Sequence, residues 1–387
     1  MIRRTLSLAK LSPDSVRAIE DGLRAVGEDI KAMQLDPETA DLTVEVESEA
    51  AAAQVEAFVE GMRRTHRLVA RKVLGEHRAG PGKGCTDEEL AACGDLHFID
   101  DGLTGINGNL LKLFRFFERT FKGFAEDFAA EEQHYPVMVP TKLLHDVGYF
   151  GNFPQHVTLC SHFPDSLPVL ETVSGAAQTS EDVPTACFGD HSAAPGHVLT
   201  PAVCLPCYSQ HRDIDLAPGE VKVLTMQNHV FRYEANRFRP LSRGWDFSVR
   251  DIVFFGSHAD LVRLRSEVME KVMAFCAELD VDVTLELAND PFFLDTGRDK
   301  IVYQRMGEVK YELLFHIPHR DDPLAVSSFN LHRDFYTSVY NTRQGGAVAD
   351  SACMGFGLER WLYGFVTQKG LDPEGWPETV RQGISTG

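Results

Sequence analysis

The sequence predicts an α+β fold, in which helices flank a mainly antiparallel sheet and a small α/β module precedes it. Three observations lead to this prediction. From Tyr135 onward, short apolar or alternating runs dominate the sequence. Most segments between these runs are too short for parallel crossovers, which need a dozen or more residues. Two longer segments, 258–279 and the region 354–368, carry the apolar spacing of helices.

The N-terminal module is predicted from four consecutive patterns. Strand, helix, strand and helix are expected at 1–10, 12–33, 41–47 and 48–75. The glycine-rich stretch 79–84 then breaks the pattern. We therefore expect a module over residues 1–95 and a larger catalytic domain over residues 104–378.

The larger domain begins with a long helix predicted over 110–132, after a glycine-bearing stretch at 101–109. The strands expected beyond it are 198–205, 221–227, 229–234, 246–255, 281–287, 310–317 and 325–331. The helix over 258–279 places Leu261, Leu264 and Val268 on one stripe.

Composition excludes several classes of protein. Of 387 residues, 43% are hydrophobic and 25% are charged, which is ordinary for a globular chain and not for a disordered one. No apolar run approaches 18 residues, and the first residues lack the apolar core of a secretory signal, so we expect no membrane and a cytoplasmic location. Eight cysteines are too sparse for a disulfide scaffold.

Net charge also bears on partners. The formal charge of -19 argues against binding to a nucleic acid backbone, because proteins that do so usually present a basic face. One basic cluster is either a solvated helix face or a docking patch for an acidic partner; it consists of Arg63, Arg64, Arg67, Arg71, Lys72 and Arg78.

Three segments carry the chemical signal. Phe231-Arg232-Tyr233-Glu234 leads into an arginine-rich turn and a return strand, a hairpin that could clamp a polyphosphate or merely expose its arginines to solvent. Gly355-Phe356-Gly357-Leu358-Glu359-Arg360 opens the final helix, where the backbone and the helix N-terminus favour an anion. The third segment is AVSSFNLHRDF, residues 325–335.

In this order the segments resemble the signature motifs of class II aminoacyl-tRNA synthetases, and among them the seryl-tRNA synthetases. Residues 231–250 resemble motif 2, and 355–360 resemble motif 3. The helix 110–132 with the following EEQHYPVMVP resembles motif 1, in which Pro136 would be the proline of the dimer interface. The resemblance covers about residues 104–375 and implies a homodimer.

The sequence departs from the seryl-tRNA synthetases in two respects, and these narrow the family that it resembles. Residues 1–95 show no long helical pair of the kind that holds tRNA in seryl enzymes. TPAVC stands at 200–204, where the serine-recognising TxE element is expected. TPAxC, FRxE, ANDPFF and ACxGFGLER are similar to the amino acid:[carrier protein] ligases, which are seryl-tRNA synthetase homologues without the tRNA-binding arm.

The resemblance implies a zinc site formed by Cys204, Glu234 and Cys353. Thiolates and a carboxylate are suitable zinc donors, and three ligands leave one position open for the amine of an amino acid. The alternatives are three separately buried residues, or a redox pair or half of a structural zinc site at Cys204-Leu-Pro-Cys207. Cys187 is a further substitute for Cys204.

The remaining site assignments also follow from the resemblance. Arg232 and Arg360 are the catalytic candidates, and Arg232, Glu234, Arg243, Arg250 and Arg360 are the ATP-binding ones. Ser328, Asn330 and His332 are candidate substrate contacts, although His332 fits a core histidine equally well. Ala325 stands where seryl enzymes carry a Mg²⁺-binding glutamate, so the ligands of the expected Mg²⁺ stay unassigned.

The function implied is ATP-dependent activation of a small amino acid, glycine or alanine, as its adenylate. The aminoacyl group would then pass to the phosphopantetheine thiol of a carrier protein, with tRNA an unlikely acceptor. Two alternatives stay open: an atypical zinc-dependent tRNA synthetase, and a non-catalytic synthetase paralogue with a binding or regulatory role.

Overall fold

The computed structural model describes residues 1–9, 11, 16, 19–20, 22–23, 29–36, 39–66, 72–80, 82, 84–233, 238–288 and 310–385, with 64–66 as backbone alone. The chain divides into two compact units. The first comprises Met1–Lys72 with Leu287–Tyr311, and the second comprises Val73–Glu286 with Glu312–Gly387.

The first unit contains a three-stranded antiparallel sheet in the order β1-β3-β2, formed by β1 (Ile2–Ser7), β3 (Asp41–Val46) and β2 (Ile30–Leu35). Alternate residues of β3 are buried in one apolar cluster with one face of α2 (Glu49–His66), as Val44 and Val55 illustrate. The alternation of apolar and polar residues along 41–47 therefore predicts this strand correctly.

The predicted helix 12–33 extends too far. Its described positions 16, 19–20 and 22–23 are helical, but Ile30–Leu35 forms β2. The predicted helix 48–75 also ends early, since α2 stops at His66 and Val73–His77 forms strand β4. Helical spacing by itself does not reveal where a chain leaves a helix for a strand.

The structure describes the side chains of only part of the basic cluster. Arg78 forms ion pairs with Glu76 and Asp282, and Arg63 lies 3.7 Å from Glu60. Arg67 and Arg71 lie outside the described residues, and Arg64 is described by its backbone alone.

The second unit is built on an eight-stranded sheet in the order β4-β14-β15-β16-β19-β13-β12-β7. Its central strands β16 (Leu324–Arg333), β19 (Asp350–Gly357), β13 (Asp246–Gly256) and β12 (Lys222–Phe231) pair antiparallel, whereas the edge strand β7 (Glu131–Gln133) is parallel to β12. The far edge contains β4, β14 (Val283–Leu287) and β15 (Lys310–Phe315). This large antiparallel sheet with flanking helices confirms the predicted fold class.

Several predicted boundaries differ from the structure. The two runs 221–227 and 229–234 form one strand, β12, up to Phe231. Of the predicted strand 198–205, only residues 198–199 lie in a strand, β10 (His197–Leu199), because the chain turns at Pro201 into α9 (Leu205–Gln210). The helix predicted over 354–368 begins later in the structure. Residues 354–357 complete β19, and the helix α13 spans Leu358–Lys369.

The domain division at 95 and 104 stays a prediction. Strand β4, which falls inside the predicted module 1–95, pairs with β14 in the large sheet. The hairpin β5 (Leu96–Asp100) and β6 (Leu103–Ile106) then leads into the helix α4 (Gly108–Asp127), predicted over 110–132. The carboxylate of Asp95 accepts hydrogen bonds from the amides of Asn109 and Leu110, which fixes the start of α4.

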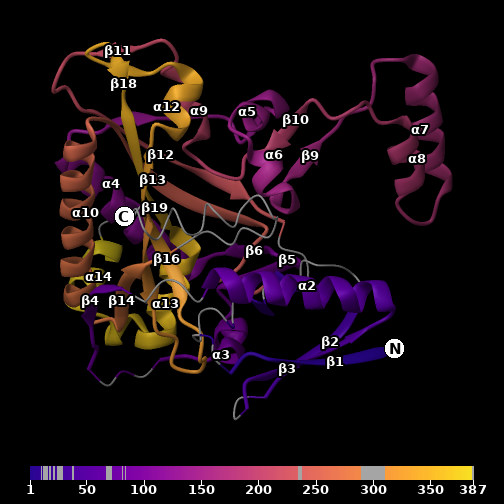
Figure 1. Cartoon of the computed structure of the whole chain (residues 1–387), viewed down its shortest axis with the longest axis horizontal. Helices are drawn as coiled ribbons and strands as arrows, with labels where there is room; N and C mark the ends of the chain where they lie inside the picture. The colour runs from indigo at the N-terminus through magenta and orange to yellow at the C-terminus, as the bar shows by residue number, and fades with distance from the viewer. Residues whose placement is uncertain are drawn as a thin grey trace. The chain divides into compact units, whose positions relative to one another are not determined.

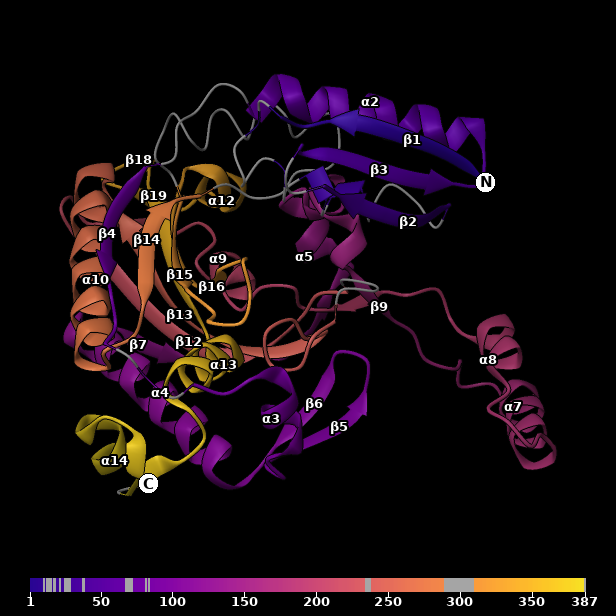
Figure 2. The same ribbon diagram turned by 90° about the horizontal axis from the view of Figure 1, so that it is seen from below.

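Helices α4, α10 (His258–Glu278) and α13 pack on one face of the large sheet (Figures 1 and 2). Aromatic rings fill this layer: Phe121 stacks on Phe356 at 4.5 Å and contacts Trp361 at 4.9 Å. Full burial of each such side chain contributes about 1.5–3 kcal/mol. The opposite face of β12, β13 and β19 packs on a second cluster that includes Cys204, Tyr208 and Cys353.

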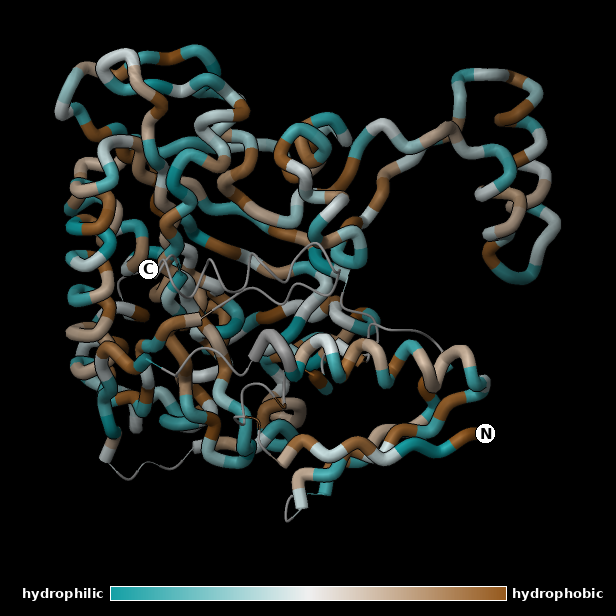
Figure 3. Tube along the Cα trace, viewed as in Figure 1, coloured by the Kyte–Doolittle hydropathy of each residue, from teal (hydrophilic) through white to brown (hydrophobic). Residues whose placement is uncertain are grey.

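A helical pair is inserted between β9 (Thr158–Cys160) and β10, which are hydrogen-bonded neighbours. Its helices, α7 (Leu167–Thr179) and α8 (Thr185–His191), bury no residue and project away from the sheet (Figures 1 and 2). Apolar segments occur along this pair as well as within the sheet (Figure 3). Across the described residues, every helix is too short or too polar to span a membrane.

Candidate active site

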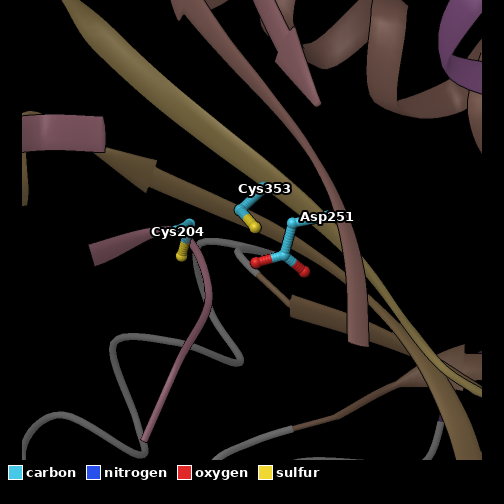
Figure 4. A group of neighbouring side chains, drawn as sticks. All are labelled: Cys204, Asp251 and Cys353. Atoms are coloured by element: carbon cyan, nitrogen blue, oxygen red, sulfur yellow. The ribbon is translucent and has the colours of Figure 1, made fainter. Parts of the chain in front are cut away.

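Two thiols and one carboxylate converge on the face of the sheet opposite α4. The sulfur atoms of Cys204 and Cys353 and a carboxylate oxygen of Asp251 all lie within 4.8 Å of one another, and all three residues are buried (Figure 4). Cys204 immediately precedes α9, Asp251 lies in β13, and Cys353 lies in β19. The fold thus assembles three groups that are far apart in sequence.

Strand register explains this convergence. Asp251 pairs with Gly355, and Cys353 lies two residues before Gly355, so their side chains share one face of the sheet. A Cβ built on Gly355 would lie 2.9 Å from Oδ1 of Asp251 and 3.3 Å from Oγ of Ser328. Glycine at position 355 therefore leaves room for the carboxylate.

Two predicted substrate contacts occupy the same rows of the sheet. Ser328 pairs with Gly355, and Asn330 pairs with Cys353. The side-chain amide nitrogen Nδ2 of Asn330 donates to Oγ of Ser328 at 3.1 Å and to the backbone carbonyl of Cys353 at 3.4 Å. The structure therefore places Ser328 and Asn330 beside the thiol–carboxylate cluster, while their contact with a substrate stays a prediction.

Burial sets the protonation of the cluster. Desolvation raises the pKa of Asp251 to about 6, against hydrogen bonds with the two thiols that act to lower it. The hydrogen bond with Cys204 and burial together raise the pKa of Cys353 well above its usual value. Hydrogen bonding with Cys353 acts to lower the pKa of Cys204, but burial and Asp251 raise it overall. Burial thus favours the neutral thiols, and a metal ion would have to displace their protons to bind the thiolates.

The donor set fits zinc, which prefers thiolate, imidazole and carboxylate ligands in a tetrahedral arrangement. Cys204, Asp251 and Cys353 are the one such group of three or more donors in the described part of the chain. Asp251 lies beside the thiols. Glu234, the third ligand that the resemblance implies, lies outside the described residues, so its place near the thiols stays a prediction.

The alternative cysteine arrangements receive no support from the described residues. Cys207 is fully buried in the apolar cluster and does not join the metal-ligand group. Cys187 lies in α8 of the inserted helical pair and does not join it either.

The two predicted catalytic arginines meet at one aromatic ring. The guanidinium carbons of Arg232 and Arg360 lie 5.7 and 5.8 Å from the ring centroid of Phe247. Arg232 donates from Nε to the carbonyl of Pro201 at 2.9 Å, and Arg360 donates from Nη1 to the carbonyl of Ala325 at 3.1 Å. Two guanidiniums beside an aromatic face suit a ligand that combines phosphate groups with a flat base.

Phe247 lies four residues before Asp251 on β13, so both side chains point to the same face of the sheet. Phe247 and Asp251 were not predicted from the sequence. The signal for both was their spacing of four residues within one predicted strand, which places them on the same face. Glu359 was not predicted as a site residue either, and its Oε2 accepts a hydrogen bond from the amide of Ser248 at 2.8 Å. Desolvation raises the pKa of Glu359 to about 7.

Arg250 points to the opposite face of the sheet. It is buried, with 3% of its side chain exposed, and forms ion pairs with Glu118 of α4 and with Glu132. Its Nη1 also donates to Oγ1 of Thr225. This placement counts against the ATP contact predicted for Arg250, because one strand cannot direct adjacent side chains to the same face.

The other predicted residues are placed as follows. Arg243 pairs with Arg239 across the loop between β12 and β13, through two backbone hydrogen bonds of 2.9 Å. His332 is partly buried and lies edge-on to Tyr336 at 4.9 Å. Ala325 offers its backbone carbonyl to Arg360. Pro136 is exposed between β7 and β8 (Met138–Pro140).

Comparison with curated proteins identifies two groups of relatives. A type-2 serine–tRNA ligase of Methanothermobacter thermautotrophicus is 25% identical over 275 residues, which are 70% of this chain and 52% of that protein. An amino acid–[acyl-carrier-protein] ligase of Bradyrhizobium diazoefficiens is 27% identical over 260 residues, which are 65% of this chain and 75% of that protein. The chain spans about half the length of the type-2 serine–tRNA ligases it matches. No protein-family model matches the chain.

Solved structures show the same fold. The seryl-tRNA synthetase of M. kandleri, solved in complex with A. aeolicus tRNASec, matches with a TM-score of 0.72 at 19% identity over 99% of this chain and 77% of that one. The cytoplasmic serine–tRNA ligase of Naegleria fowleri, in complex with AMP, matches with a TM-score of 0.63 at 11% identity over 88% of this chain and 81% of that one. The chain therefore has the class II fold of the seryl-tRNA synthetases, and type-2 serine–tRNA ligases and an amino acid–carrier-protein ligase are among the proteins similar to it in sequence.

Proposed function

We propose that the chain is an ATP-dependent ligase that activates a small amino acid, glycine or alanine, and transfers it to the phosphopantetheine thiol of a carrier protein. One observation carries this proposal: the thiol–carboxylate cluster and the Arg232–Phe247–Arg360 group lie on the same face of β13 and β19. A site for an amine is thus next to a site for a nucleotide.

The nucleotide site is assigned from charge and shape. Arg232 neutralises the α-phosphate and the amino acid carboxylate, and Arg360 binds the terminal phosphate, because a guanidinium fork matches phosphate oxygens bidentately. The ring of Phe247 offers a face for the adenine. The Mg²⁺ that accompanies ATP binds mainly phosphate oxygens and a few carboxylates, which we leave unassigned.

The amine site consists of Cys204 and Cys353 with one carboxylate, from Glu234 or Asp251. A bound zinc ion there would supply an open position for the neutral α-amine. Ser328 and Asn330 border this cluster and are the groups placed to contact a short amino acid side chain. His332, with Tyr336 beside it, stays a candidate for the same role.

In the first half-reaction a carboxylate oxygen of the amino acid attacks the α-phosphorus, and the bond to the bridging oxygen of pyrophosphate breaks. Positioning and charge neutralisation supply most of the catalysis in such a step. In the second, the carrier thiol, losing its proton, attacks the carbonyl carbon of the mixed anhydride. AMP leaves, and a thioester forms.

The choice of acceptor rests on charge. The inserted pair α7–α8 carries only acidic charges, and no Lys or Arg occurs from 143 to 211; its acidic residues are Asp165, Glu171, Glu181, Asp182 and Asp190. Such a surface repels a polyanion within a Debye length of about 8 Å at physiological salt. The similarity to an amino acid–carrier-protein ligase over 75% of that protein also supports a carrier. We keep the homodimer and the cytoplasmic location as parts of this proposal.

The decisive experiment is ATP–pyrophosphate exchange across the twenty amino acids, with and without a chelator. We expect exchange with one or two small amino acids and its loss after chelation. The amino acid that supports exchange is then offered with phosphopantetheinylated carrier proteins and with bulk tRNA, and the label is followed.

The alternatives predict other results. A tRNA synthetase, which the type-2 serine–tRNA ligase relatives favour, would charge tRNA and leave carriers unlabelled. A non-catalytic paralogue would show no exchange with any amino acid.

A further inference from the structure

The β5–β6 hairpin contacts the loop that joins β12 to β13. The carbonyl of Gly102, in the hairpin turn, accepts a hydrogen bond from the amide of Trp245 at 2.9 Å. The carbonyl of Trp245 in turn accepts a hydrogen bond from the amide of Arg232 at 2.9 Å. Two consecutive backbone hydrogen bonds therefore connect Gly102 to one of the two candidate catalytic arginines.

Only glycine fits at position 102. Its φ is +74°, a conformation that other residues adopt at a cost. An added Cβ would lie 2.5 and 2.8 Å from the ring atoms Cδ1 and Cε1 of Phe238, and 2.8 Å from the amide nitrogen of Trp245. That nitrogen already donates to Gly102, so the clash is relieved only by moving the two segments apart.

The described part of this loop resists displacement, because the rings of Tyr233, Phe238 and Trp245 pack on one another. Phe238 stacks on Trp245 at 6.1 Å and meets Tyr233 edge-on at 5.8 Å. The indole of Trp245 also donates to Oγ1 of Thr158 at 2.8 Å. A displacement at Gly102 is therefore passed to Trp245, whose backbone holds Arg232 and lies two residues before Phe247.

We propose that Gly102 is a positioning residue for nucleotide binding: it holds Trp245, and through it Arg232 and Phe247, in the geometry that receives ATP. This inference rests on the proposed function, since it takes the Arg232–Phe247–Arg360 group to be the nucleotide site. A displacement of about 1 Å at a reacting group lowers rates by up to about 10²-fold, so a small shift of the hairpin is sufficient to matter.

The test compares Gly102→Ala with Gly94→Ala. Gly94 also has a positive φ, of +80°, but no atom lies within 4 Å of its added Cβ, so this control carries the backbone strain without the contact. Two quantities are measured: the dissociation constant for ATP, and amide hydrogen exchange in peptides covering 238–249. We expect Gly102→Ala to weaken ATP binding about 10-fold or more relative to Gly94→Ala, with faster exchange in the loop.

Each outcome decides between the hypotheses. Equal ATP affinity in the two variants overturns the positioning role, whether or not loop exchange rises. If the wild-type protein binds no ATP, the proposed function is refuted. Faster hydrogen exchange in the loop of Gly102→Ala would then still support the structural connection between Gly102 and Trp245.

If Gly102→Ala fails to fold, Phe238→Ala replaces it, because this variant removes the ring from the contact and leaves the hairpin unchanged. It should weaken ATP binding as well, because Trp245 loses the ring on which it stacks, and an unaltered affinity overturns the claim that this aromatic packing passes a displacement to the nucleotide site. Where all variants fold, the double variant should lose less affinity than the sum of the two single variants, since the ring no longer meets the added methyl group.

Discussion

Substituting Gly355 by alanine tests whether the thiol–carboxylate cluster is functional. The added Cβ would lie 2.9 Å from Oδ1 of Asp251, and reaching an ordinary carbon–oxygen separation of about 3.3 Å requires a shift of about 0.4 Å. Overpacking of this kind costs about 1–3 kcal/mol, partly offset by about 0.5–1 kcal/mol because alanine is less flexible than glycine within a strand.

The net loss of stability should therefore be about 1 kcal/mol, and the effect on function should be larger. Functional groups need placement to within about 0.5 Å, so we expect about a 10-fold loss in ATP–pyrophosphate exchange together with weaker retention of zinc. Equilibrium unfolding, elemental analysis and the exchange assay measure the three quantities.

Gly357→Ala is the matched control on the same strand. Its added Cβ would lie 3.5 Å from the carbonyl of Val326 and 3.7 Å from Arg360, which are ordinary contacts. We expect zinc content to stay close to wild type in this variant. If Gly355→Ala retains zinc as well as Gly357→Ala does, the carboxylate of Asp251 has no part in the metal site.

Four further predictions concern other residues. Cys353→Ala should lose the zinc found by elemental analysis, whereas Cys276→Ala, in the helix layer on the other face of the sheet, should keep it; full retention in Cys353→Ala rules out the metal assignment. Arg360→Ala should lower adenylation by at least about 10²-fold, and near-normal exchange would mean that motif 3 is misplaced. Arg250→Met should destabilise the fold in denaturant unfolding, but by less than the loss of about 3–5 kcal/mol for a fully buried ion pair, because the carboxylates of Glu118 and Glu132 stay partly exposed to solvent. A several-fold loss of ATP affinity in folded Arg250→Met, against our expectation, would restore its predicted nucleotide contact. Burial raises the pKa of Glu359 from 4.5 to about 7, so the native state holds this proton more tightly than the unfolded state does, and stability should fall as pH rises through this interval. Glu359→Gln should remove that part of the pH dependence, and identical pH profiles of stability would refute the burial argument.

The sequence alone was sufficient to predict the class of fold and most of the sheet. Alternation along 246–255 and 325–331 predicts strands that the structure confirms, as does the helical spacing over 258–279. These patterns are local, because the side chains of a strand repeat about every 2 residues and those of a helix about every 3.6 residues. Local patterns do not show where one element gives way to the next, and the boundaries at 30–33 and 354–357 are wrong for that reason.

The candidate site likewise contains some residues that were predicted from the sequence and others that only the tertiary structure revealed. The resemblance of the sequence motifs to those of known ligases led to Cys204, Cys353, Arg232 and Arg360, because these motifs are visible in the sequence. The tertiary structure decided that Asp251 lies beside the thiols, that the guanidinium carbons of Arg232 and Arg360 lie 5.7 and 5.8 Å from the ring centroid of Phe247, and that Arg250 contacts Glu118 of α4. Register between strands more than 90 residues apart fixes these neighbours, and a shift of one residue would turn each of these side chains to the other face of the sheet.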